Sequence, residues 1–175
     1  MNIPGLGDCS FDELYGCYSS VPLSLPVLDG AKCRILLESY EEDPVREEFQ
    51  EAINNFLVAP NSVLSNAAPH IFKYYQEIKS YCEPSDKEFP VIGSPHEVWR
   101  HIQFGAQAIV SRRPYGDRGI YVSLECNCSW EPEHGLQIIF KNGAAVNKVG
   151  PYDGHLTNSD AYADSALENV IYRQA

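Results

Sequence analysis

A run of alternating apolar and polar residues between positions 120 and 130 constrains the fold of this chain more than any other feature. One set of alternate positions is suited to a core (Ile120, Val122, Leu124, Cys126, Cys128 and Trp130), and the intervening set is mostly polar (Tyr121, Ser123, Glu125, Asn127 and Ser129). Successive side chains of a strand point to opposite faces of its sheet. The pattern therefore predicts a half-buried strand.

Two further strands are predicted to follow this one. Leu136–Lys141 is a short apolar run, and Trp130–Gly135 separates it from the first strand with a proline and a glycine. Asn142-Gly143 is the pair best suited to the positive φ angles of a two-residue hairpin turn, so residues 144–149 are expected to return as a strand. The polar residues of Trp130–Gly135 are thus expected in a connection between neighbouring strands.

The N-terminal part of the chain has the pattern of a second hairpin. Ser20–Leu28 alternates apolar residues with prolines, which is typical of an edge strand because proline donates no ladder hydrogen bond. Asp29-Gly30 suits the turn, and Lys32–Ser39 the returning strand.

Helices are expected in four regions. Asp43-Pro44 has the residue types of a helix start, and the apolar face that follows comprises Val45, Phe49, Ile53, Phe56 and Leu57. A second helix over residues 63–78 contains Pro69, which should kink or divide it because proline removes a backbone hydrogen bond. Ser94–Glu97 has the sequence of a capping box, and residues 163–172 suit a short C-terminal helix.

Composition limits the function classes. A chain of 175 residues that is 44% hydrophobic is expected to form a single domain over residues 1–175. The formal net charge of −11 argues against nucleic acid as a partner, because phosphate contacts need clustered Lys and Arg. Acidic residues crowd the first predicted long helix, which is typical of a solvated face and also suits docking of a basic protein partner.

No targeting or membrane signal is present in the sequence. The N-terminus lacks the basic start and apolar core of a signal peptide, and no run approaches the ~18 apolar residues of a membrane span. We therefore expect a cytoplasmic protein with no membrane partner, in which the six scattered cysteines are free thiols. No cofactor is expected. The three arginines of residues 112–119 could hold an anion, but solvated loop charges are the preferred interpretation.

Two chemical hypotheses involve the Trp130–Gly135 segment. Cys126, Cys128 and His134 offer the ligand types that zinc prefers, with Asp153 or His155 as a fourth ligand. On a strand, however, the Cα atoms of the two cysteines would lie roughly 6.6 Å apart with parallel side chains, so chelation of one metal ion would need a bulge.

The second hypothesis is acid–base catalysis by His134, oriented by Glu133, Asp153 or Glu125. The chain contains neither a G-x-S-x-G nucleophile elbow nor a G-x-x-x-x-G-K-[ST] phosphate loop. A hydrolase or metal-binding enzyme that uses residues 130–134 is therefore the alternative, not the preferred function.

The same segment also has a purely structural interpretation. Trp130 would close the end of the sheet, Glu133 would accept backbone N–H groups within the turn, and Gly135 would take a positive φ. His134 would contact a carbonyl or Asp153. Recognition by the turn is the other interpretation, and its candidate binding residues are Trp130, Glu133, His134, Asp153 and His155.

Two motifs resemble those of an uncharacterised bacterial family of domains of unknown function. C-S-W-E-P-E-H-G-L at Cys128–Leu136 is similar to a Cys-x-Trp-[Asp/Glu]-x-Glu-His-Gly signature at a strand end, and K-V-G-P-Y-D at Lys148–Asp153 to a later strand that ends in Val-Gly. Gln137-Ile138 departs from the Gly-Val that often follows in that family. The resemblance implies one fold over most of the chain but no reaction, and the family is occasionally linked to immunity-like proteins.

Together these observations predict an α+β domain. Its sheet should be mostly antiparallel, with about six strands and two or three helices packed on one face. The expected function is a non-catalytic protein- or ligand-binding domain, with an immunity-like role suggested by the resemblance.

Overall fold

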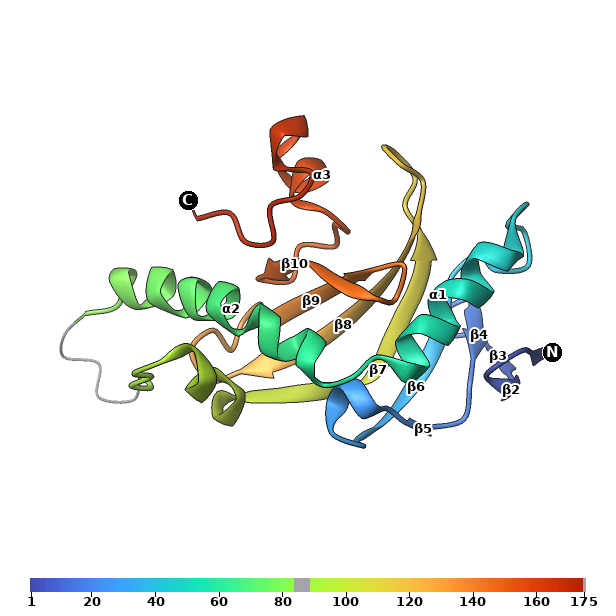
Figure 1. Ribbon diagram of the computed structural model, residues 1–175, viewed down its shortest axis with the longest axis horizontal. Helices are drawn as coiled ribbons and strands as arrows, with labels where there is room; N and C mark the ends of the chain where they lie inside the picture. The colour runs from blue at the N-terminus through green and yellow to red at the C-terminus, as the bar shows by residue number, and fades with distance from the viewer. Residues whose placement is uncertain (84–88, 175) are drawn as a thin grey trace.

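The computed structural model describes residues 1–83 and 89–174 and shows a long sheet flanked by helices (Figure 1). In chain order its elements are β1 (Asn2–Ile3), β2 (Gly7–Asp8), β3 (Ser10–Asp12), β4 (Cys17–Ser19), β5 (Leu23–Ser24), the 3₁₀ helix η1 (Pro26–Leu28), β6 (Lys32–Leu37), α1 (Arg46–Val58), α2 (Ser62–Tyr81), the 3₁₀ helix η2 (Pro95–His101), β7 (Ile102–Arg112), β8 (Ile120–Cys128), β9 (Leu136–Lys141), β10 (Ala145–Gly150), α3 (Asn158–Tyr162) and the 3₁₀ helix η3 (Ser165–Leu167). The sequence also predicts a polar loop over residues 82–93, of which residues 84–88 lie outside the described part.

Within the described residues, eight strands form the main sheet, against the six or so expected, and they confirm the mixed α+β class and the mostly antiparallel pairing. The strand order is β10-β9-β8-β7-β6-β4-β3, and β5 pairs with β6. Within this sheet, as far as the structure describes it, only β6 and β7 run parallel. Parallel neighbours need a long crossover, and α1, α2 and η2 lie in that connection. The placement of the helices on one face stays a prediction.

The Asn142-Gly143 hairpin turn between β9 and β10 is confirmed. Asp29-Gly30, by contrast, ends the 3₁₀ helix η1 within a longer connection from β5 to β6, and the predicted edge strand is too long. Asn142 and Gly143 have φ angles of 50° and 65°, and Asp29 and Gly30 have 52° and 82°. The strand predicted over residues 20–28 is reduced to β5, because the chain turns into η1 at a proline whose fixed φ suits the first turn of a helix.

The two long helices lie where the apolar periodicity placed them, with shifted starts. α1 begins two residues after Pro44, because Asp43 accepts the Val45 N–H at 2.8 Å and pairs with Arg112 instead of capping the helix. Val45 is exposed, so its predicted place on the core face was wrong. α2 runs without division through Pro69.

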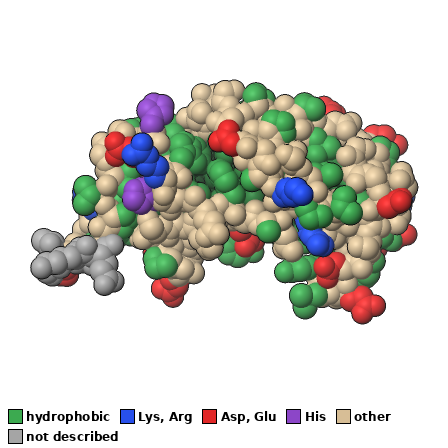
Figure 2. Space-filling view, turned by 90° about the horizontal axis from the view of Figure 1, so that it is seen from below, with side chains coloured by type: hydrophobic (Ala, Val, Ile, Leu, Met, Phe, Trp, Pro, Cys, Tyr) green, Lys and Arg blue, Asp and Glu red, His purple; other side chains and the backbone are tan. Residues whose placement is uncertain are grey.

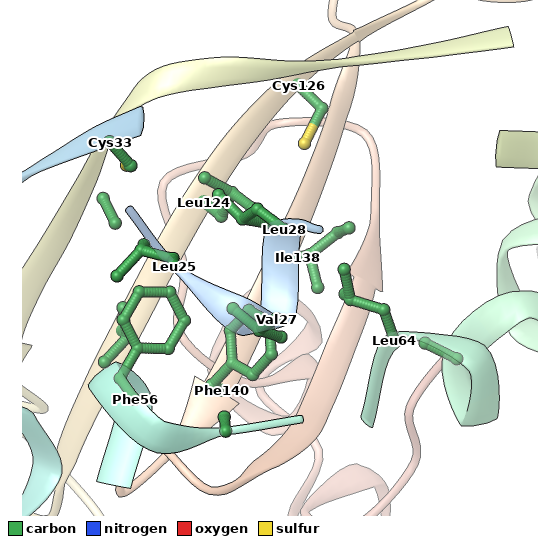
Figure 3. Packing of buried hydrophobic residues seen from close by; sticks show 14 of the residues in the cluster. Leu25, Val27, Leu28, Cys33, Phe56, Leu64, Leu124, Cys126, Ile138 and Phe140 are labelled. Carbon is green, nitrogen blue, oxygen red and sulfur yellow. The ribbon is translucent and has the colours of Figure 1, made fainter. Parts of the chain in front are cut away.

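The core combines side chains of the sheet with side chains of η1, α1 and α2. Figure 3 shows Val27, Phe56 and Leu64 converging on Leu124 and Phe140 of the sheet. The rings of Phe56 and Phe140 meet edge to face at 5.1 Å, a geometry that aromatic pairs favour. All the apolar alternate positions of β8 belong to this cluster, as the sequence predicted.

The shorter predicted helices are only partly correct. The helix expected over residues 163–172 is wrong: α3 ends before it, and η3 is the one helical turn within it. Ser94 makes no side-chain cap bond, and the residues that follow form the 3₁₀ helix η2. The Glu97 carboxylate does reach back, but to the Gly93 N–H at 2.8 Å. Among the described helices, none combines the length and the apolar character needed to cross a membrane.

Candidate functional site

The turn from Trp130 to Gly135 connects β8 and β9, as the sequence predicted. Trp130 is 2% exposed, and its ring meets those of Tyr74 and Tyr75 edge to face at 6.1 Å each. The Tyr74 hydroxyl donates a hydrogen bond of 3.1 Å to the Gly135 carbonyl. Trp130 therefore supports the turn from the core side and offers no exposed surface for recognition.

Glu131, not Glu133, holds the turn together. The Oε1 atom of Glu131 accepts the backbone N–H groups of Glu133 and His134 at 3.1 Å each, and it lies 3.4 Å from His134 Nδ1. Gly135 has a φ of 63°, and a Cβ at this position would lie 2.5 Å from the Cys126 carbonyl oxygen. The prediction that Glu133 accepts these bonds was therefore wrong, because the carboxylate two residues earlier reaches both donors.

The exchange of Glu131 for alanine should destabilise the protein by about 1 kcal/mol, because two N–H groups of the turn lose their acceptor. The exchange of the exposed Glu133 for alanine should change the free energy of unfolding by less than ~0.5 kcal/mol. Urea unfolding followed by tryptophan fluorescence measures both. Equal effects of the two exchanges would contradict the conclusion that Glu131, and not Glu133, accepts the backbone N–H groups of the turn.

Cys126 and Cys128 lie in the core and not beside His134. The Cys126 side chain points toward the hydrophobic cluster (Figure 3). Burial raises the pKa of each thiol to about 12, so both are protonated near neutral pH. The acidic and imidazole groups of Glu131, Glu133 and His134 do have ligand atoms within 4.8 Å of one another, two of these residues being exposed.

Asp153 and His155 belong to a different cluster, built around a buried lysine. Lys148 is 2% exposed, and its ammonium group donates to Asp153, to the His155 carbonyl at 3.0 Å and to Gln137 Oε1 at 3.4 Å. Burial lowers the pKa of Lys148, and Asp153 opposes that effect. The Asp153 carboxylate also accepts the His155 N–H at 2.9 Å, so it fixes the segment that follows β10.

Two of the three arginines predicted to be solvated loop charges, Arg112 at the end of β7 and Arg113 after it, are engaged in ion pairs, so the prediction was wrong for these two. Arg113 is 2% exposed and binds the carboxylates of Asp160 and Glu168 with several hydrogen bonds, together with Asp117 at 3.3 Å. These contacts raise the pKa of Arg113 and lower those of Asp160 and Glu168. They attach α3 and η3 to the β7–β8 loop.

Arg112 is paired in the same way on the side of α1. Its Nε and Nη2 atoms donate to the Asp43 carboxylate at 2.6 and 2.9 Å, and Nη1 donates to Glu48 at 2.5 Å. Asp43 accordingly has a lowered pKa, and the main cause is its hydrogen bond with Arg112. Neither arginine is left free to bind an anion.

A cleft of about 630 Å³ lies between the polar alternate positions of the sheet and the segment that follows β10. We call it the C-terminal cleft; its sheet side includes Glu38, Ile109, Ser123, Glu125 and Gln137, and its other side includes Tyr152, His155, Leu156 and Asp160. The Gln137 amide donates to Ser123 Oγ at 3.2 Å and accepts from Lys148, which orders the floor of the cleft.

A second hollow of about 400 Å³ adjoins this cleft at the Trp130–Gly135 turn. Glu125 and Tyr152 line both spaces, while Glu133 and His134 line only the second. The Tyr152 N–H donates to the His134 carbonyl at 3.2 Å, which joins the two regions. The predicted residues Glu133, His134 and His155 thus lie along one continuous surface, whereas Trp130 lies beneath it.

The sequence did not single out Glu38 or Tyr152 as site residues. Glu38 follows β6, and β6 reaches the cleft only because it pairs in parallel with β7. Tyr152 follows β10 and bends back over the polar positions of the sheet. The one local signal was the polar alternation of β8, which includes Ser123 and Glu125.

Comparisons with known proteins give a family but no activity. No curated protein and no solved structure matches the chain. The model of a domain of unknown function, DUF6985, matches residues 5–156. This range covers every strand of the main sheet and all residues that line the C-terminal cleft except Ser159, Asp160 and Ala163. The chain therefore belongs to the DUF6985 family of domains of unknown function.

Proposed function

We propose that this chain is a non-catalytic binding domain and that the C-terminal cleft is its binding site. The observation that carries the proposal is the cleft of about 630 Å³ itself, which joins an apolar wall at Ile109 and Leu156 to ordered polar groups at Ser123 and Gln137. Ligand sites typically enclose ~300–1,000 Å³ and combine apolar walls with a few placed polar groups. A cytoplasmic location and an immunity-like role belong to the same proposal.

The candidate residues from the sequence take distinct parts in it. His155 lines the cleft, and Asp153 positions it through its backbone N–H. Glu133 and His134 extend the surface into the adjoining hollow, and Trp130 packs under the turn. A ligand longer than the cleft would reach these two side chains past Tyr152.

A basic protein is the partner that the charge of the chain favours. The net charge is −11, and on the face drawn in Figure 2 acidic side chains are more frequent toward the end where Figure 1 places the N-terminal strands. Such a distribution accelerates association with a positively charged partner. A Lys or Arg side chain of this partner would enter the C-terminal cleft.

A metal-binding or hydrolytic role of the turn is the second candidate, favoured by the three ligand atoms of Glu131, Glu133 and His134. Cys126 and Cys128 would not take part without leaving the core. Zinc sites use three or four protein ligands, and Glu131 already accepts two backbone N–H groups. Binding at the cleft needs no such rearrangement, so we rank it first.

Protein-observed ¹H–¹⁵N NMR with a fragment library tests the proposal. Fragments that bind should shift the backbone amides of Ile109, Ser123 and Tyr152, and the variant Ser111→Trp, which places a ring inside the cleft, should lose them. Ser10→Trp, on the exposed position of an edge strand, is the matched control and should keep them. The absence of cleft-binding fragments, or their equal binding to Ser111→Trp, would contradict the proposed function.

A further inference from the structure

The charges that line the C-terminal cleft do not balance. Arg112 contributes to the lining, but its guanidinium group is occupied by Asp43 and Glu48. Asp160 also contributes, and its carboxylate is occupied by Arg113. Each of these groups therefore already has its counter-charge outside the cleft.

Glu38 and Glu125 differ from these groups because neither carboxylate has a hydrogen bond or ion pair with any other residue of the described chain. Desolvation raises the pKa of Glu38, which shows that its surroundings do not compensate the negative charge. The nearby carboxylate of Asp153, by contrast, is paired with Lys148. Two unpaired carboxylates in one cleft leave a local excess of negative charge.

An aromatic ring lies close to both carboxylates. The pKa of Tyr152 is raised first by burial and then by the charges of Glu125 and Glu38, so both charges act at its phenol group. Tyr115 is a second ring of the lining and is 72% exposed. A cation held between carboxylates and tyrosine faces gains both Coulombic and cation–π attraction.

From this arrangement we infer that the C-terminal cleft binds an organic cation, a guanidinium or primary ammonium group on an apolar stem. Glu38 and Glu125 supply the counter-charge, Tyr152 contacts the cation, and Ile109 with Leu156 contacts the stem. The inference rests on the proposed binding function and adds the chemical class of the ligand. The cation could belong to a small molecule or to a basic side chain of a protein partner.

Benzamidine and benzamide form a matched probe pair for this inference, because they share shape and differ in charge. We expect benzamidine to shift the amides of Ser123, Glu125 and Tyr152 in ¹H–¹⁵N spectra, and benzamide to bind at least ~10-fold more weakly, which corresponds to about 1.4 kcal/mol. The double variant Glu38→Gln with Glu125→Gln should reduce benzamidine affinity by the same factor and leave benzamide unchanged.

A control variant separates the cleft from the general acidity of the protein. Glu13→Gln with Glu42→Gln changes the net charge equally, at two exposed positions that do not line the cleft, and should retain benzamidine affinity. Thermal unfolding should show both double variants to be folded, since removal of unpaired carboxylates breaks no ion pair. Equal losses in the two double variants would overturn the inference, because the effect would then be non-specific.

The remaining outcomes distinguish the inference from the proposed function. Equal binding of benzamide and benzamidine overturns the cation inference while the binding site stands. If neither probe nor any library fragment shifts the cleft amides, the proposed function falls as well. A capped peptide, acetyl-Gly-Arg-Gly-amide, distinguishes the sources: binding as tight as that of benzamidine supports a basic protein segment, and weaker binding supports a small molecule.

Discussion

Alanine in place of Gly143 should destabilise the protein by about 3 kcal/mol or more, one of the two largest effects expected of a single substitution. Gly143 has a φ of 65°, and a Cβ there would lie 2.0 Å from the carbonyl oxygen of Ala52 in α1. Asn55 donates to the Asn142 carbonyl at 3.0 Å and holds the turn against the helix. The turn therefore cannot move away without loss of this contact.

Gly16→Ala is the matched control for this prediction. Gly16 has a φ of 64°, but a Cβ there would meet no other atom within 4 Å. The same conformational cost applies, so Gly16→Ala should lose only ~1 kcal/mol. Urea unfolding of both variants isolates the steric contribution as the difference. Similar losses would show that the close contact between the β9–β10 turn and α1 does not constrain the fold.

Methionine in place of Arg113 should cost about 3 kcal/mol, because the buried guanidinium group is the shared partner of Asp160 and Glu168. Both carboxylates would then repel each other without a counter-charge. Their pKa values are lowered in the folded protein, so the ion pairs stabilise it at neutral pH and this contribution is lost as the pH falls through the folded pKa values. The difference in stability between Arg113→Met and the wild type should therefore shrink in acid.

Arg118→Gln is the control for Arg113→Met, since it removes an exposed arginine of the same loop and should change stability by less than ~0.5 kcal/mol. Relative to the wild type, amide hydrogen exchange in Arg113→Met should accelerate more in α3 than in β8, because the ion pairs attach the C-terminal segment to the sheet. Unchanged stability, or uniform acceleration over the whole sheet, would disprove this role of Arg113.

The strands of the C-terminal half were predictable because their signals are local. The alternation of β8 and the apolar run of β9 agree with the observed strands, and the Asn142-Gly143 turn has the φ angles that its residue types favour. The helix periodicity of α1 and α2 was equally local. The start of α1 was not predictable from local signals, because Asp43 pairs with Arg112 of β7, a residue far along the chain.

The candidate site was predictable only at the turn. The sequence located Glu133 and His134 in a connection between strands, and the structure adds that Glu131 orders this connection. The sequence interpretation grouped Asp153 and His155 with the same turn. In the structure, Asp153 instead pairs with the buried Lys148 and accepts the His155 N–H beside the C-terminal cleft. Proximity along the chain did not predict which charges pair, because pairing depends on burial and on the path of each loop.

By itself, the sequence determined the strands β8, β9 and β10, the hairpin turn between β9 and β10 and the apolar faces of the long helices, because side-chain period and turn chemistry act over a few residues. Only the tertiary structure decided that β6 lies parallel to β7, which brings Glu38 to the same cleft as Glu125. It also decided that Arg113 pairs with Asp160 and Glu168 and so encloses that cleft. Such contacts join segments that no local preference relates, and they form only when burial makes an unpaired charge costly.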